Sequence, residues 1–431
     1  MKKFFPICIC LVLLLSGCRA NTDEYLSEIN KFFKSETVNE VYESIVEKAG
    51  TVTDNIISYV KSGIAKDDNS ITIDPSYVTF EYEDYIAYQT LTQNQKKLYS
   101  IFLSAINNME LRQIDITKYA VGDVFSEAVI AHRALMCDRP DMFWAPKTFS
   151  VLSAEKSNKR YICFSDNTEN NSDTGYYGIT KSQKQEMQAE LDAVTENIVN
   201  NANLLETDFQ KELYIHDYIC ENVTYDEESA TSLSEADLNS LTVYGALVEG
   251  KAICEGYSKA MQYLCTKVGI PCGVVYGKHE TVPHMWNIIR VDGDSYYLDV
   301  TFDDSSKIAV LHTYFNITKS EISNDHIFDS EFDNGSVYDS LDSFNFFCPD
   351  CEYTSMNFFE NTGAYITYTC EKAREIIAEQ NENGKNCAEF KNSTFLPSDA
   401  AFLLLKNACR GQVRLKTCYK MDGSDIIIVI W

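Results

Sequence analysis

The sequence lacks any long apolar run that could cross a membrane after its first fifteen residues, since no later stretch approaches the ~18 apolar residues that a spanning helix needs. It also lacks internal repeats and low-complexity segments. Of the 431 residues, 45% are hydrophobic and 23% are charged. This composition excludes a disordered, collagen-like or coiled-coil chain and is typical of two or three globular units.

Basic residues are scarce, with 37 Lys and Arg against 64 Asp and Glu and a formal net charge of −27. So acidic a surface repels phosphate backbones, and we expect no nucleic-acid partner. Paired metal motifs are missing too, because no second Cys-x-x-Cys follows Cys348-Pro349-Asp350-Cys351. A structural role for Cys348 and Cys351, bridged or free, is favoured over half of a zinc site or a redox pair. We expect no metal and no cofactor.

The chain begins with the pattern of a secretory signal. Two lysines precede an apolar run at 4–15, which is too short to span a bilayer. Leu15-Ser16-Gly17-Cys18 resembles the bacterial lipobox, in which the signal is cut before the cysteine and that cysteine is lipidated. An ordinary signal peptide is the alternative. We expect an exported protein that Cys18 anchors to the outer face of the cell membrane.

Hydrophobic periodicity divides the chain into regions. These are a signal peptide at 1–17, an anchor and helical stalk at 18–70, a small α/β module at 71–175, a central domain at 176–322 and a C-terminal α+β region at 323–431. The pattern predicts helices at 23–64, 93–108, 123–136, 182–200, 207–220 and 240–248, a hairpin of 149–154 with 160–164, and strands at 79–82 and 425–431.

Cys254 lies where a helix is predicted to begin, because Tyr257, Met261 and Leu264 follow it at helical spacing. Free N–H groups and the positive end of the helix dipole stabilise a thiolate at such a position. A thiolate is a nucleophile, so a catalytic cysteine is expected there. Many cysteines begin helices without any function, and further residues are needed to decide.

A β-hairpin is predicted downstream, from a strand at 283–291 and a strand at 295–302. Asp292-Gly293 between them is typical of a two-residue type I′ turn. That turn sets Asp299 opposite Trp286 and makes His284 a diagonal neighbour of Asp299 on the same face, with α-carbons ~7–8 Å apart.

These positions predict a catalytic arrangement. Cys254 would attack a carbonyl, His284 would take up and return a proton, and Asp299 would orient the imidazole. The backbone N–H of Cys254 is a natural oxyanion donor. Asn287 falls on the opposite face of the strand and is the weaker candidate to orient His284.

Several motifs resemble those of bacterial transglutaminase-like domains, in the transglutaminase/papain-like superfamily. They are Thr242-Val-Tyr-Gly-Ala-Leu, Gly250-Lys-Ala-Ile-Cys-Glu-Gly-Tyr, His284-Met-Trp-Asn and Tyr297-Leu-Asp-Val-Thr, and the stretch with Asp325-His326 also resembles the segment after the core in such lipoproteins. The resemblance covers about 180–320. It implies an α+β fold with a papain-like core of helices on an antiparallel sheet, smaller flanking α/β regions, and the triad of Cys254, His284 and Asp299.

The expected function is a surface-anchored, cysteine-dependent acyl-transfer enzyme. Its partners would be protein or peptide substrates, with a cell-wall peptide among the candidates, and its reaction would be hydrolysis or transfer to an amine. The alternative is a catalytically inactive lipoprotein that keeps the fold as a binding or scaffold module.

The other histidines are expected to be bystanders. His279 is the rival base, but its polar surroundings favour a solvated loop residue. His216 is expected at the surface or half-buried. His132, His312 and His326 have no companions at metal-ligand spacing. Cys220, Cys265 and Cys272 are expected in the core.

Overall fold

The computed structural model describes residues 60–64, 70–75, 85–154, 157–164, 178–231, 238–304, 309–331, 345–392, 396–420 and 425–431. The expected signal peptide, the lipid attachment at Cys18 and the strand at 79–82 lie outside the described residues. Of the helices expected at 23–64, only 60–64 is described, and it is a strand, β1 (Val60–Ile64), that pairs in parallel with a strand at 149–153. The helical prediction is wrong there because tertiary pairing decides the conformation of so short an apolar segment.

The N-terminal module is built on a five-stranded sheet in the order β1-β4-β5-β3-β2. The remaining strands are β2 (Ser70–Ile71), β3 (Gln113–Asp115), β4 (Phe149–Ser153) and β5 (Arg160–Cys163), and the helices are α4 (Ile86–Thr90), α5 (Gln93–Asn107) and α6 (Val124–Asp138). The predicted hairpin and both predicted helices are confirmed. Thr92 caps α5 and Asp123 caps α6, each accepting a backbone N–H of the first turn.

The central body places helices on an antiparallel sheet in the order β10-β9-β8-β11. Its strands are β8 (Cys272–His279), β9 (Val282–Val291), β10 (Asp294–Leu298) and β11 (His326–Phe328), with a small ladder of β6 (Thr224–Tyr225) and β7 (Lys251–Ala252). Its helices are α7 (Lys181–Ala202), α8 (Asp208–Asn222), α9 (Glu227–Thr231), α10 (Cys254–Lys267), α11 (Val300–Asp303) and α12 (Lys319–Ile322). The helix expected at 240–248 is divided into a 3-10 turn, η4 (Leu238–Leu241), and a short helical segment that includes the π-helical η5 (Gly245–Glu249). Gly250 ends this segment with φ +69°, as expected.

The β9–β10 hairpin has the predicted register, with Asp294 opposite Val291 and Leu298 opposite Asn287. Both turn residues have positive φ, 52° at Asp292 and 89° at Gly293, as a type I′ turn requires. The strand prediction fails after Leu298. Asp299 leaves the ladder and becomes the N-cap of α11, because its carboxylate accepts the free N–H groups of that helix.

The C-terminal body is a three-stranded sheet covered by helices. Its strands are β12 (Cys387–Lys391), β13 (Thr417–Lys420) and β14 (Ile426–Ile430), and its helices are α13 (Phe358–Thr362), α14 (Glu371–Glu382) and α15 (Ser398–Cys409). The predicted terminal strand is confirmed as β14, which is buried between its two neighbours. β11, beyond the expected boundary at 322, joins the central sheet through β8.

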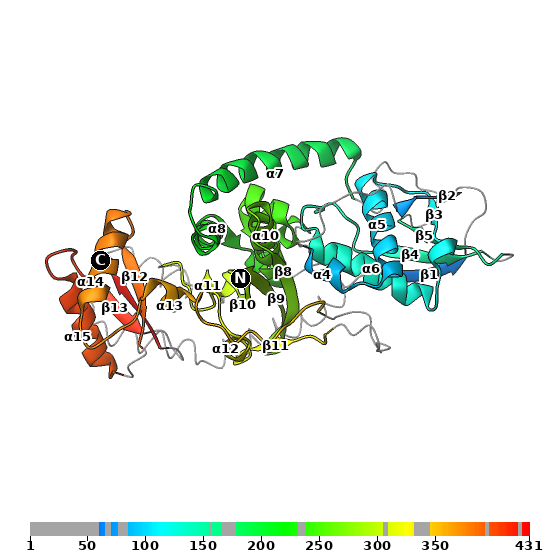
Figure 1. Cartoon of the computed structure of the whole chain (residues 1–431). Helices are drawn as coiled ribbons and strands as arrows, with labels where there is room; N and C mark the ends of the chain where they lie inside the picture. Colours follow the sequence, from blue (N-terminus) through cyan, green and yellow to red (C-terminus); the bar gives the residue numbers. More distant parts are fainter. Residues whose placement is uncertain are drawn as a thin grey trace, which may run out of the picture.

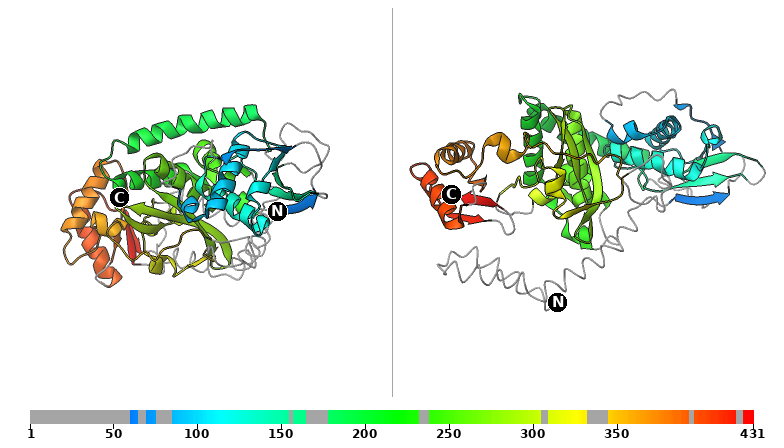
Figure 2. Two further views of the ribbon diagram at one scale, coloured as in Figure 1. Left: turned by 45° about the vertical axis from the view of Figure 1, so that its right-hand side comes forward. Right: turned by 60° about the horizontal axis from the view of Figure 1, so that its bottom comes forward.

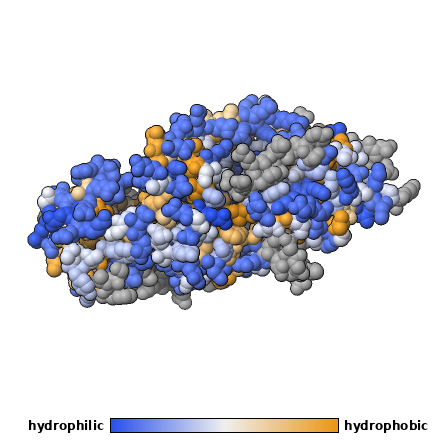
Figure 3. Space-filling view, in the orientation of Figure 1, coloured by the Kyte–Doolittle hydropathy of each residue, from blue (hydrophilic) through white to orange (hydrophobic). Residues whose placement is uncertain are grey.

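The three bodies follow one another in a row, with the central body in the middle (Figure 1). Helix α7 runs along one side from the central body towards the N-terminal module, an arrangement also visible in the turned views (Figure 2). Hydrophilic residues dominate the face in Figure 3, with apolar patches between them. Within the described residues, no helix combines the length and the apolar character needed to cross a membrane.

Candidate active site

Cys254 is the first residue of α10, directly after the extended N-cap Ile253 and the short strand β7. Close packing fixes this position. A Cβ on Gly256 would lie 2.6 Å from the carbonyl oxygen of Ser240 and 2.7 Å from Cβ of Ala252, so only glycine fits. Cys254 is partly exposed, whereas most of the helix behind it is buried. The thiol is thus held at the edge of a rigid helix where a substrate can reach it.

Hydrogen bonds tie the nucleophile helix to strand β9. The hydroxyl of Ser258 donates to the carbonyl of Met285 at 2.9 Å, and Nδ2 of Asn287 donates to the carbonyls of Ser258 at 2.9 Å and Gly273 at 3.1 Å. Asn287 is fully buried, and both of these hydrogen bonds from its Nδ2 go to backbone carbonyls. Its role is therefore to set the distance between α10 and β9, as expected for a residue facing away from His284.

His284 and Asp299 meet as the hairpin register predicts. Nε2 of His284 lies 2.6 Å from Oδ2 of Asp299. Oδ1 of Asp299 accepts the backbone N–H groups of Thr301 at 3.0 Å and Phe302 at 3.1 Å. Burial alone would raise the pKa of Asp299, but His284 and His326 hold it well below its usual range. The carboxylate is thus ionised and fixed in orientation.

The electrostatics of His284 favour its charged form. Burial lowers the pKa of His284, but the Asp299 carboxylate and hydrogen bonds with Asp299 and Cys254 outweigh burial and raise the pKa to about 10. Nε2 of His284 is engaged by Asp299, which leaves Nδ1 as the ring nitrogen available to a thiol. An imidazolium beside the sulfur stabilises the thiolate form of a cysteine. These three side chains can therefore act as nucleophile, proton carrier and orienting carboxylate.

A fourth residue, His326, joins the site and was missed by sequence reasoning. Its Nε2 lies 2.9 Å from Oδ2 of Asp299, and its Nδ1 lies 2.6 Å from Oδ1 of Asp325. The hydroxyl of Tyr314 donates in turn to Asp325. Asp299 thus receives two imidazoles at one oxygen. The expectation that His326 has no companions is wrong, because β11 brings it back beside β8.

His279 is not the solvated loop residue that its neighbours suggest. It ends strand β8, is half-buried, and its ring lies 4.7 Å from the ring of Phe302. Burial and then the nearby His326 lower its pKa. A neutral His279 lines the side of the site without replacing His284 on Asp299.

The N-terminal module contributes a charge next to the nucleophile. Glu255 is buried and pairs with Lys147 at 3.1 Å and Lys259 at 2.6 Å. Burial raises the pKa of Glu255, but the two lysines outweigh it and lower the pKa to about 2. Burial and the nearby Cys254 also raise the pKa of Tyr225, so its hydroxyl stays protonated.

Two other expectations need correction. His216 is fully buried rather than at the surface, and His312 shares the carboxylate of Asp217 with it. Two groups of described residues could hold a metal ion: His284, Asp299 and His326 at the site, and His216, Asp217 and His312 elsewhere. Among the cysteines, those expected in the core (Cys220, Cys265 and Cys272) are buried, and Cys348 and Cys351 are buried free thiols packed near Tyr297.

Residues 192–300 match the family model described as the Transglutaminase-like superfamily. No curated protein matches the chain. Among solved structures, a TGase is similar at 16% identity over 46% of this chain and 55% of its own, with a TM-score of 0.27. A protein from Cytophaga hutchinsonii with the provisional name cysteine protease matches at 21% identity over 26% of this chain and 37% of its own, with a TM-score of 0.22. A provisionally named protease from Parabacteroides distasonis matches at 12% identity over 35% of each chain, with a TM-score of 0.21.

The chain therefore spans about half the length of the TGase and about a third of the other two structures. The family match falls on the segment that carries Cys254, His284 and Asp299. The central body has a transglutaminase-like α+β fold, which confirms the expected fold class.

Proposed function

We propose that the protein is a cysteine-dependent acyl-transfer enzyme that acts on protein or peptide amide bonds, anchored through Cys18 to the outer face of the cell membrane. The observation that carries the catalytic part is the chain of contacts from Cys254 through His284 to Asp299. Cys254 begins a helix, His284 lies on a strand and Asp299 caps another helix. The three side chains therefore meet because of the fold and not because they are adjacent in the sequence.

The reaction follows from these positions. The Cys254 thiolate attacks the amide carbonyl carbon, and the backbone N–H at the start of α10 stabilises the oxyanion. The His284 imidazolium gives its proton to the leaving amine, and the C–N bond breaks to leave a thioester. Water or a primary amine then attacks the thioester, His284 takes the proton of that nucleophile, and the thiolate leaves. The product is a carboxylic acid or a new amide.

Alkylation with iodoacetamide, mapped by mass spectrometry, tests the nucleophile. A free cysteine with a pKa near ~8.5 is only a few per cent thiolate at pH 7, so a thiolate–imidazolium pair should react about tenfold faster. His284→Ala should remove that advantage at Cys254. Cys370→Ser is the matched control, because Cys370 is another partly exposed free thiol, and it should leave the rate at Cys254 unchanged.

The outcome also separates the proposed enzyme from an inactive scaffold. Labelling of Cys254 no faster than that of Cys370 would favour the scaffold. For an active protein, casein offered with a labelled primary amine distinguishes the two reactions. Incorporation of the amine indicates transfer, and new peptide termini indicate hydrolysis.

A further inference from the structure

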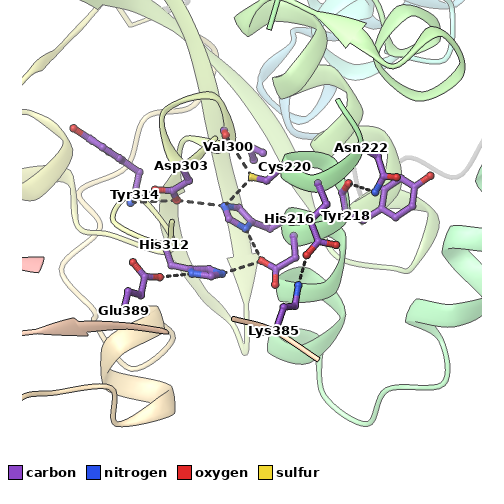
Figure 4. A network of polar contacts seen from close by, with 12 residues as sticks. His216, Tyr218, Cys220, Asn222, Val300, Asp303, His312, Tyr314, Lys385 and Glu389 are labelled. Atoms are coloured by element: carbon purple, nitrogen blue, oxygen red, sulfur yellow. Dashed lines mark hydrogen bonds and ion pairs between the residues drawn. The ribbon is translucent and has the colours of Figure 1, made fainter. Parts of the chain in front are cut away.

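A second cluster of histidines and carboxylates lies away from Cys254, at the junction of the central and C-terminal bodies (Figure 4). His216 and Asp217 are on α8, and His312 is in the segment after α11. Glu389, on β12 of the C-terminal sheet, reaches the ring of His312. The cluster therefore joins three parts of the chain that are distant in sequence.

Its central atoms have the spacing of metal ligands. Oδ1 of Asp217 lies 3.1 Å from Nδ1 of His216 and 2.9 Å from Nε2 of His312. The ligand atoms of the three residues all lie within 4.8 Å of one another. A tetrahedral zinc ion with bonds of about 2.0–2.1 Å holds its ligand atoms about 3.3 Å apart, so small side-chain shifts suffice to admit it.

The ring nitrogen of each histidine that does not face Asp217 contacts another carboxylate, as is usual for histidines that bind metals. Nε2 of His216 lies 3.3 Å from Oδ2 of Asp303, and Nδ1 of His312 contacts the carboxylate of Glu389. A histidine that binds a metal nearly always donates its other N–H to a carboxylate or carbonyl, which fixes the tautomer and the ring orientation. Phe358 stacks on the His312 ring at 3.9 Å and holds its plane.

Most of this cluster is buried away from water. His216 and Asp303 are 0% exposed, His312 is 7% exposed and Glu389 is 6% exposed. Oε2 of Glu389 is buried and has no hydrogen-bond partner within the described part of the chain. Three carboxylates gathered in such surroundings are stabilised by a cation. Asp217 is 29% exposed and gives a path from solvent.

We propose that His216, Asp217 and His312 bind one divalent transition-metal ion of the Zn²⁺ class, with Asp303 and Glu389 orienting the two imidazoles. Two imidazoles and one carboxylate suit zinc better than magnesium or calcium, which prefer oxygen ligands. Three protein ligands leave a fourth position for water. Because Glu389 belongs to β12, the bound ion would fasten the C-terminal sheet to the central body.

Titration calorimetry on the purified full chain, first stripped with EDTA and then given ZnCl₂, tests the site. One equivalent should bind with a Kd of about 1 μM or tighter. His312→Gln and Asp217→Asn should each weaken binding at least about 100-fold, and Glu389→Gln about 10–100-fold. His284→Gln is the matched control, because it disrupts the other group that could hold a metal and should leave this binding intact.

Melting curves guard against misfolded variants. Zinc should raise the melting temperature of the wild type and not that of Asp217→Asn, a nearly isosteric change at a partly exposed position. The proposal is overturned if the wild type binds no zinc below ~100 μM, or if binding disappears in His284→Gln and persists in His312→Gln. Both readouts are independent of Cys254, so either result leaves the proposed acyl-transfer function untouched.

Discussion

Replacing His326 should slow the chemistry at Cys254 although His326 does not contact the thiol. His326 supplies one of the two imidazole contacts of Oδ2 of Asp299, at 2.9 Å. A hydrogen bond to a charged group contributes about 1.5–3 kcal/mol, which corresponds to a factor of about 10 to 150 in rate if all of it is lost in the transition state. Thr301 and Phe302 still hold Oδ1, so we expect the lower end, about tenfold, for His326→Ala.

The assay is the alkylation rate of Cys254 as a function of pH. A positioning role predicts a lower rate and a shifted profile in His326→Ala, with partial recovery in His326→Gln, whose amide can still donate to Asp299. His132→Gln is the matched control, because His132 is fully buried in the N-terminal module, where its Nε2 meets the carbonyl of Pro146. A wild-type rate and profile in a folded His326→Ala protein would refute the reasoning.

Three further predictions each depend on a single observation. The pKa of His284 is raised to about 10, so the stability that its charge contributes is fully present below the ordinary pKa of ~6.5 and is lost as pH rises through about 10. The free energy of unfolding, measured as a function of pH, should show this loss in the wild type and much less of it in Asp299→Asn. Gly256→Ala should destabilise the fold by about 1–3 kcal/mol in urea unfolding, since its Cβ would lie 2.6 Å from a backbone oxygen. Cys18→Ala should move the protein from the membrane fraction to the soluble fraction, whereas retention at the membrane would count against lipid anchoring.

The local parts of the site could be predicted because their determinants are local. Asp292-Gly293 sets the hairpin register, which ends with Leu298 opposite Asn287 and so brings the next residue, Asp299, close to His284. Helical spacing likewise places Cys254 at the start of α10. The capping role of Asp299 could not be read from alternation, because Tyr297 and Phe302 suit a strand equally well and the helix begins between them.

The contacts that the sequence did not predict join residues that are far apart in the chain, so residue spacing gives no sign of them. His326 reaches Asp299 only because β11 pairs with β8, with His326 opposite His279. His216 looked like a surface residue because Asp217 comes directly after it, yet α8 turns His216 towards Asp303. A neighbouring aspartate in the sequence is therefore a poor indicator that a histidine is exposed. Asp217 contacts both His216 and His312, and His216 is fully buried.

The candidate site therefore extends beyond the segment that matches the family. The match ends at residue 300, but Asp299 is held partly by His326, and Asp325 and Tyr314 hold His326 in turn. A Cβ on Gly277 would lie 2.1 Å from the carbonyl oxygen of Ile327, so β11 packs directly on the central sheet. A chain that stopped at 322 would keep Cys254 and His284 but would leave this sheet edge uncovered and Asp299 with one imidazole. Activity should therefore depend on residues to at least 328, and a truncation that retains β11 should outperform one that removes it in the same alkylation assay.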